Sequence, residues 1–310
     1  MATRSPRPLV TVVGSSNTDM VINTPTLPRP GETVLGGVFR TAAGGKGANQ
    51  AVAAARAGGD VRFVARVGDD NLGRAALAGF RKDRIDVGRV LPTEGTASGV
   101  ALITVDRAGE NCIAVAPGAN GLVTPADVER AFQDVAPPAV VLVQLEIPLE
   151  AVKATVRMGR VLGAVVVLNP APARVLPPAI LKLVDVLTPN ESEAALLTGI
   201  EVRDQVGAGK AAAKLRDMGV RCVIVTLGAK GAWIQDDTGG RLIPGFKMKA
   251  VDTTAAGDVF NGALAVALGE GKQVAEAVRF ANAAAGISVT RLGAQPSAPT
   301  RAEITKLLGA

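Results

Sequence analysis

The sequence predicts an α/β protein in which helices flank a mostly parallel β-sheet, with a small second β-sheet beside it. Short runs rich in β-branched residues alternate with Ala-rich helical segments, which is the pattern of βαβ units. Two stretches, at residues 19–41 and 96–116, instead carry alternating strand patterns with no helix between them, so they cannot be crossovers of a parallel sheet. We therefore expect residues 1–310 to form a single α/β domain, with the small sheet built from these two separated insertions.

The elements of the main sheet follow one another along the chain. Buried strands are expected at residues 9–13, 61–67, 139–144, 165–169, 183–188 and 222–226. Helices between them are expected at residues 47–57, 71–84, 125–133, 149–162, 192–198 and 208–218, where Gly, Pro, Asn or Asp flank each segment. From residue 257 onward the alternation stops, and three helices are expected at residues 258–268, 274–289 and 301–308.

The composition excludes several classes of function. The chain contains no His, so it has neither a Ser-His-Asp nor a Cys-His nucleophile and no His-ligated metal. The net charge is +6, but Lys and Arg are dispersed and Trp233 is the only Trp, so no binding surface for nucleic acid is expected. No membrane span and no signal peptide are expected, and two Cys without CxxC spacing fit a reducing compartment. The sequence thus predicts a cytoplasmic protein, and its positive charge suits a small phosphorylated ligand.

Polar residues follow several predicted strands at the point where each strand ends. Asn17 and Asp19 follow the first strand, Glu146 follows the third, and Asn190 follows the fifth. Because ligands of doubly wound sheets bind outside the carboxyl ends of the strands, this shared position predicts a ligand site. Asn17 and Asp19 also fit an Asx turn, and Glu146 fits a solvated loop. Asn190 with Glu193 fits a helix capping box, so each residue singly has a structural explanation.

The segment at residues 252–262 carries the most informative local signal. Ala255, Ala256 and Gly257 lead into a predicted helix, so its first N–H groups are unobstructed and point, with the helix dipole, at whatever lies in front. This arrangement predicts an anion-binding site. Asp258 lies in the first turn, where a carboxylate also stabilises a helix, and that structural role is the alternative.

The glycine-rich segment at residues 43–50 also opens a helix. Its glycines would let a ligand approach the backbone, while Lys46 and Asn49 can donate hydrogen bonds to hydroxyl oxygens. A tight entry turn with a solvated Lys is the alternative. The segment is not a Walker A loop, because Lys46 is followed by Gly and Arg40 stands where that loop needs Gly. Residues 207–212 match GxGxxA but follow polar residues, which indicates a plain helix start.

Several motifs taken in order resemble the ribokinase-type carbohydrate kinase family. They are VVGSSNTD at 12–19, PGET at 30–33, GGKGANQAVA at 44–53, NPAPA at 169–173, TPNE at 188–191, DTTAAGD at 252–258 and GAQPS at 293–297. The resemblance covers nearly the whole chain. It implies a Rossmann-like α/β domain with a small β lid at about 19–41 and 96–116, and a homodimer formed through the lids. It also implies ATP-dependent phosphorylation of D-ribose at the 5-hydroxyl to give ribose 5-phosphate and ADP.

The same resemblance implies a role for individual residues. Asp258 would accept the hydroxyl proton, and the N–H groups around Ala255, Ala256 and Gly257 would hold the charge on the transferring phosphoryl group. The sugar would be held by Asn17, Thr18, Asp19, Gly45, Lys46, Gly47, Ala48, Asn49 and Glu146, together with Asp258. The nucleotide would contact Asn190, Thr226, Leu227, Gly228, Ala229, Lys230, Gly231, Gly257, Asp258 and, near adenine, Asn282.

Two kinds of cation are implied in addition. Glu193 would help to organise Mg²⁺, through water, because Mg²⁺ keeps several waters and binds mainly through phosphates. K⁺ would lie beside the anion site, held by carbonyl or side-chain oxygens of Asp252, Thr254, Ser288, Arg291, Gly293 and Ser297. Relatives often carry His where this chain has Asn282, so this position departs from the family pattern.

Two other functions remain open at this point. The first is the same chemistry on a different acceptor, such as another sugar or a nucleoside. The second is a sugar-binding protein that kept the fold without catalysis. An intact Asp258 and Gly257 favour a kinase, since binding alone needs no base.

Overall fold

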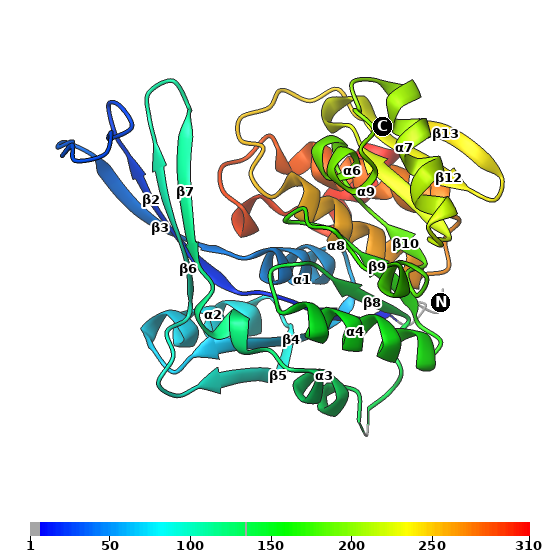
Figure 1. Ribbon diagram of the computed structural model, residues 1–310, viewed down its shortest axis with the longest axis horizontal. Helices are drawn as coiled ribbons and strands as arrows, with labels where there is room; N and C mark the ends of the chain where they lie inside the picture. The colour runs from blue at the N-terminus through cyan, green and yellow to red at the C-terminus, as the bar shows by residue number, and fades with distance from the viewer. Residues whose placement is uncertain (1–6, 134) are drawn as a thin grey trace.

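The computed structural model describes residues 7–133 and 135–310 and shows a nine-stranded sheet with helices on both faces (Figure 1). The strand order is β13-β12-β11-β10-β9-β8-β1-β4-β5. The strands are β1 (Leu9–Val13), β4 (Asp60–Gly68), β5 (Asp86–Thr93), β8 (Val140–Val143), β9 (Val165–Leu168), β10 (Val186–Leu187), β11 (Cys222–Thr226), β12 (Gly231–Asp236) and β13 (Gly239–Pro244). All pair in parallel except β12, which pairs antiparallel with β11 on one side and with the edge strand β13 on the other. The predicted α/β class with a mostly parallel sheet is confirmed.

Two hydrophobic cores lie on opposite faces of this sheet. Val10 and Val12 of β1 belong to one core and Val13 to the other, as the alternation along a strand requires. The first core packs α1 (Lys46–Arg56), α2 (Asn71–Lys82), α8 (Ala256–Gly269), α9 (Val274–Ser288) and α10 (Arg301–Leu308). The second packs α3 (Pro125–Ala131), α4 (Leu149–Val161), α5 (Pro178–Leu181), α6 (Glu191–Thr198) and α7 (Gln205–Asp217).

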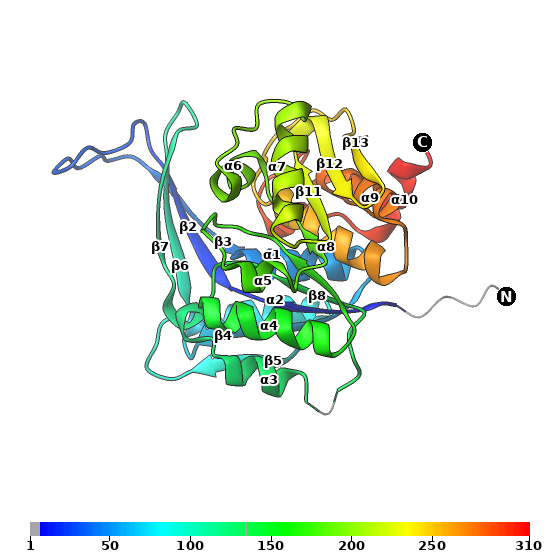
Figure 2. The same ribbon diagram turned by 45° about the vertical axis from the view of Figure 1, so that its right-hand side comes forward.

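A separate four-stranded sheet, called here the small sheet, projects from one side of the molecule (Figures 1 and 2). It consists of β2 (Asn17–Asn23), β3 (Val38–Gly44), β6 (Gly99–Val105) and β7 (Asn111–Ala116), in the order β3-β2-β6-β7. These strands come from the two helix-free insertions that the sequence singles out. Strands β2 and β3 extend further toward the main sheet than the expected limits of 19–41, and this extension carries them to the helix α1.

The structure corrects the sequence-based elements in four places. The strand expected at residues 183–188 is only two residues long, because it is confined to Val186–Leu187 between β9 and β11. Strand β5 was not expected, since Gly88 and Pro92 interrupt its pattern and it lies at an edge of the sheet. The antiparallel pair β12 and β13 was also not expected. The helix expected from residue 208 begins at Gln205, where Asp204 caps it by accepting from the Gly207 N–H at 2.8 Å.

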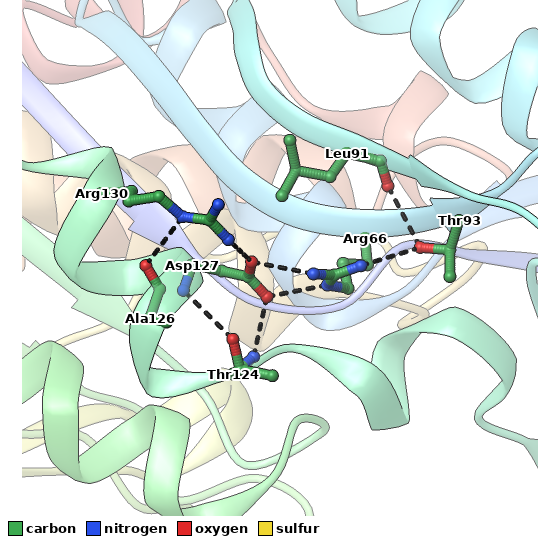
Figure 3. Close-up of polar contacts among 7 residues, drawn as sticks. All are labelled: Arg66, Leu91, Thr93, Thr124, Ala126, Asp127 and Arg130. Carbon is green, nitrogen blue, oxygen red and sulfur yellow. Dashed lines mark hydrogen bonds and ion pairs between the residues drawn. The ribbon is translucent and has the colours of Figure 1, made fainter.

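An ion-pair network fixes α3 to the main sheet (Figure 3). Asp127, 3% exposed, accepts from Arg66 Nε at 2.7 Å, from Arg66 Nη2 at 2.8 Å and from Arg130 Nη2 at 2.9 Å. Asp127 and Thr124 also form a capping box at the start of α3. Burial opposes ionisation, but the bonds from Arg66 and Thr124 prevail and lower the pKa of Asp127 to about 2. This carboxylate therefore stays charged under all ordinary conditions.

No helix among the described residues is long and apolar enough to cross a lipid bilayer. The N-terminal stretch in which no signal peptide is expected lies partly outside the described residues, at positions 1–6.

Candidate active site

The carboxylate of Asp258 lies at the centre of the site, in the first turn of α8. Its Oδ2 accepts from Asn49 Nδ2 at 3.0 Å and its Oδ1 accepts from Gln50 Nε2 at 2.9 Å. Both donors come from α1, which packs against α8 through Gly262, where a Cβ would lie 2.6 Å from the Gln50 carbonyl oxygen. Burial raises the pKa of Asp258, and the charge of Lys46 and the bonds from Asn49 and Gln50 oppose this rise. A carboxylate in this setting can accept a proton.

Two further carboxylates and a lysine surround Asp258. Glu146, in the loop after β8, accepts from Ser15 Oγ at 2.6 Å and from the Lys46 N–H at 3.0 Å, so it is not the solvated loop residue of the alternative interpretation. Burial, together with the charges of Glu146 and Asp258, raises the pKa of Asp19 to about 6. Burial disfavours the charge on Lys46, but the surrounding carboxylates outweigh burial and raise its pKa. The pocket thus offers acceptors and a charged donor, which suits a polyhydroxylated ligand.

The glycines of the segment 43–50 serve backbone packing. A Cβ on Gly47 would lie 2.5 Å from the backbone nitrogen of Ser15, and one on Gly44 would lie 2.3 Å from Asp19 Oδ2. Gly45 has φ +87° and would place a Cβ 2.6 Å from the Asn17 nitrogen. These glycines let α1 start directly against the end of β1 and leave room for the Asp19 carboxylate. These are close approaches between two parts of the chain, and the approach expected toward a ligand stays a prediction.

Three residues that were expected to contact the sugar instead face other parts of the protein. Ala48 is fully buried in the first core, and its N–H donates to the Ser15 carbonyl at 2.8 Å, so the structure does not place it against a ligand. Asn17 is buried, and its Oδ1 accepts from Asn120 Nδ2 at 2.6 Å. Thr18 borders a separate cavity between the small sheet and α2. Asp19, Lys46, Asn49, Glu146 and Asp258 are the predicted residues that the structure brings together.

The start of α8 is shaped for an anion. Ala255 adopts the left-handed conformation, with φ 59°, and the Ala256 N–H donates to Thr253 at 3.2 Å. Within the described part of the chain, the N–H groups of Gly257 and Asp258 have no acceptor. A Cβ on Gly257 would meet no atom within 4 Å, so the space before this glycine is open. Free donors, a helix N-terminus and open space together fit a phosphoryl group.

The open space before Gly257 is a cavity of about 190 Å³. Besides the start of α8 it is lined by Lys46, Asn169, Thr188, Asn190 and Glu193. Asn190 and Glu193 form the capping box that the sequence allowed, with 2.8 Å between the Asn190 N–H and Glu193 Oε2. Burial raises the pKa of Glu193, although the bond from Asn190 opposes the rise. Glu193 lines this phosphate-sized cavity together with Asp258, which fits Mg²⁺, since Mg²⁺ uses one or two carboxylates together with phosphates and water.

A second cavity of about 240 Å³ adjoins the first, and both are lined by Thr226, Thr253, Ala256 and Gly257. Gly228, Ala229 and Gly231 line it too, whereas Leu227 is buried in the second core. Apolar side chains, among them Phe246 and Met248, close the far part. Asn282 lines this part, but its Nδ2 donates to the carbonyls of Ile243 and Pro244 at 3.1 and 3.2 Å. The shape suits a nucleotide whose base lies among apolar groups and whose phosphates reach Gly257.

The loop expected to hold K⁺ is organised around Asp252. Its Oδ1 accepts from the Thr254 N–H at 2.9 Å and its Oδ2 from the Gly293 N–H at 2.8 Å. The Arg291 side chain pairs with Glu303, so only the Arg291 carbonyl remains as a ligand. Ser288 and Ser297 Oγ each donate to a carbonyl, of Ala285 and Ala294, and keep lone pairs free. Neutral oxygens beside one carboxylate fit a monovalent cation. Among the described residues no cluster of three or more Asp, Glu or Cys forms a metal site.

Sequence reasoning missed the buried amides around Asp258. Gln50 and Gln144 are fully buried, and Gln144 Nε2 donates to Gln50 Oε1. Asn120, in the helical turn Gly118–Leu122, binds the start of β2 through Ser16 and Asn17. Gln50 belongs to a motif already noted, and Gln144 ends a predicted strand at the ligand edge. Their places in a motif and at a strand end were the signals that the sequence offered, but a place in the sequence does not show which way a side-chain amide points.

Comparison with known proteins gives consistent results. Residues 7–301 match the model of the pfkB family carbohydrate kinases. A ribokinase from Haemophilus influenzae is 45% identical over 302 residues, covering 97% of this chain and 99% of the relative. A deoxyribokinase from Salmonella typhimurium is 36% identical and covers 96% of this chain and 98% of the relative. The structure of an Arabidopsis thaliana ribokinase complexed with ribose and ATP superposes with a TM-score of 0.90, at 34% identity, over 99% of this chain and 100% of that one.

Proposed function

This chain belongs to the pfkB family of carbohydrate kinases, and from this premise we propose that it transfers the γ-phosphoryl group of ATP to the 5-hydroxyl of D-ribose. The family predicted from the sequence is confirmed by the family match. The predicted kinase activity agrees with the ribokinase relatives and with a relative that binds ribose and ATP. The observation that carries the proposal is the place of Asp258, a buried carboxylate of raised pKa beside free N–H groups at a helix N-terminus.

The proposed reaction follows from this geometry. The ribose 5-oxygen attacks the γ-phosphorus, a new P–O bond forms, and the bond between the γ-phosphorus and its bridging oxygen breaks to release ADP. Asp258 accepts the hydroxyl proton as the attack proceeds. The N–H groups of Gly257 and Asp258 stabilise the charge on the γ-phosphoryl oxygens. Asp19, Asn49 and Glu146 orient the sugar from the opposite side.

Mg²⁺ would neutralise charge on the β- and γ-phosphates, with Glu193 and its water shell on the protein side. We propose in addition that K⁺ binds at the Asp252 loop. A helix N-terminus carries only about half a positive charge, so a cation beside it strengthens the field at the anion site. Replacing Na⁺ by K⁺ at fixed ionic strength is expected to raise kcat, and Asp252→Ala is expected to remove the difference. Equal rates in both salts would contradict the site.

We also propose that the small sheet acts as the lid and joins two subunits. Its exposed apolar residues include Phe39, Leu102, Ile113 and Val115, each more than half exposed. Light scattering after gel filtration should show a dimer, and Leu102→Glu should shift it to a monomer. A monomeric wild-type protein would contradict this assembly.

Location in the cytoplasm fits the free Cys112 and Cys222.

The acceptor is tested by a coupled assay for ADP release with a panel of sugars. D-ribose is expected to give the highest kcat/KM, above 2-deoxyribose, fructose and nucleosides. The alternative of a different acceptor is favoured by the deoxyribokinase relative, and 2-deoxyribose is therefore the discriminating member of the panel. Ribose binding in calorimetry without ADP release would instead support a non-catalytic sugar-binding protein.

A further inference from the structure

A chain of buried amides runs from the backbone to the Asp258 carboxylate. Asn169 Nδ2 donates to the Thr188 carbonyl at 3.0 Å, and Asn169 Oδ1 accepts from Gln50 Nε2 at 3.0 Å. Gln50 Nε2 also donates to Asp258 Oδ1 at 2.9 Å. Gln144 Nε2 donates to Gln50 Oε1 on the other side. We propose that Gln50 is a positioning residue for the proposed base Asp258, with Gln144 and Asn169 fixing the direction of its amide.

The direction of each amide follows from chemistry. The Thr188 carbonyl can only accept, so Asn169 must turn its Nδ2 toward it and its Oδ1 toward Gln50. Oδ1 of Asn169 needs a donor, which requires the Nε2 end of Gln50 at that position. The second hydrogen of the same Nε2 then points at Asp258. A flipped Gln50 would set its one amide oxygen against two acceptors, Asn169 Oδ1 and Asp258 Oδ1, and is excluded by the whole chain of bonds.

Gln50 lies behind Asp258, because Asp258 lines the cavity before Gly257 and Gln50 does not. It is fully buried, whereas Asn49, the preceding residue, reaches the other carboxylate oxygen from the sugar side. Two consecutive residues of α1 therefore hold the two oxygens, one from within the core and one from the pocket. Loss of the Gln50 donor would free the carboxylate to rotate and remove one bond that favours its charged form.

The charged groups that act on Asp258 come from several elements. Lys46 of α1 favours its charged form, and Glu146, in the loop after β8, disfavours it. Asp19 of β2 and Glu193 of α6 are also coupled to Asp258. None of these groups is removed by changing Gln50, so a shift in the pH profile of a Gln50 variant reports the lost amide donor.

The test is the pH dependence of kcat and kcat/KM for ribose in Gln50→Met, which keeps the length of the side chain without its donor. The acidic limb should move to higher pH by about one to two units, because losing a hydrogen bond to the charged carboxylate raises its pKa by about that much. On the acidic limb kcat should fall about tenfold relative to the wild type at the same pH, and it should be largely regained on the alkaline plateau, while KM for ribose changes less than about threefold. Gln144→Met should shift the limb in the same direction by a smaller amount, and it remains a test if Gln50→Met does not fold.

A matched control separates this role from loss of a buried hydrogen bond in general. Thr155 is fully buried on α4, where its hydroxyl donates to the Ala151 carbonyl at 2.8 Å, away from the site. Thr155→Val should leave the pH profile unchanged. A Gln50→Met profile that superimposes on the wild type, or an equal loss of kcat at every pH, would overturn the proposal. Because the proposal rests on the kinase function, a wild-type protein without ribose-dependent ADP release would instead refute that function.

Discussion

Two buried aspartates of this protein are held in opposite ways. Asp127 meets two guanidinium groups and a capping N–H, and its pKa falls to about 2 (Figure 3). Asp258 meets only amide donors on its two oxygens, and burial raises its pKa. The first is a fixed charge that joins α3 to β4, and the second is a carboxylate that can gain and lose a proton. Asp127 accepts four hydrogen bonds, three of them from guanidinium groups, whereas Asp258 accepts two, both from neutral amides. The number and the charge of the donors therefore separate a structural carboxylate from a proton acceptor.

The largest expected effect is on turnover at Asp258. Asp258→Asn keeps the shape of the side chain but cannot take a proton, so kcat should fall by about 10²–10⁴-fold. Ribose and ATP binding, measured by calorimetry, should persist. A loss of less than about tenfold in kcat would argue against Asp258 as the base.

The same substitution at Asp127 should lower stability and leave turnover nearly unchanged. Asp127→Asn removes the charge that Arg66 and Arg130 share, and hydrogen bonds to charged groups contribute about 1.5–3 kcal/mol. The free energy of unfolding in urea should fall by about that amount, while kcat of the folded enzyme stays within about twofold of the wild type. A stable protein with low kcat would reverse the assignment of the two aspartates.

Opposite pH dependences should sharpen the comparison further. Asp127 has a pKa lowered from 3.8 to about 2, so its contribution to stability is complete above pH 4 and is lost as the pH falls toward 2. Asp19 has a pKa raised from 3.8 to about 6, so its ionisation lowers stability as the pH rises through that window.

The ionised form of Asp19 is the stronger acceptor for a sugar hydroxyl. The KM for ribose should therefore rise as the pH falls below about 6, roughly tenfold per unit. Asp19→Asn should give a high KM that no longer changes over this range. Steady-state kinetics between pH 5 and 8 tests both statements, and a wild-type KM that is flat below pH 6 would contradict them.

The smallest effect is expected at Ala255. This residue holds a left-handed conformation, with φ 59°, that costs a side chain about 1–2 kcal/mol. Ala255→Gly should raise stability by about 0.5–1 kcal/mol, the gain being reduced by the greater freedom of glycine in the unfolded chain. Thermal unfolding measures the change, and a lower stability would show that this backbone is unstrained.

The sequence predicts most of the main helices well because their ends carry local signals, such as Asp70 before α2 and Thr300 before α10. It does not predict β5, whose Gly88 and Pro92 hide an edge strand, because pairing with β4 rather than local preference forms it. In the site, Lys46, Asn49 and Asp258 were found through motifs at helix starts. The bond from Gln50 to Asp258 and the bond from Gln144 to Gln50 were missed, since they join residues 94 or more positions apart.

The connections of the small sheet are short and constrained near the main sheet, and long and unconstrained at its far end. Near the main sheet, β1 ends at Val13 and β2 starts at Asn17, while β3 ends at Gly44 and α1 starts at Lys46. An insertion there would displace Asn49 and Gln50 from the carboxylate. At the far end, residues 24–37 form a largely exposed connection, and doubling such a loop costs only about 0.6 kcal/mol. The tip of this hairpin is therefore the place where a fluorescent label or a peptide tag would leave Asn49 and Gln50 in register with the carboxylate.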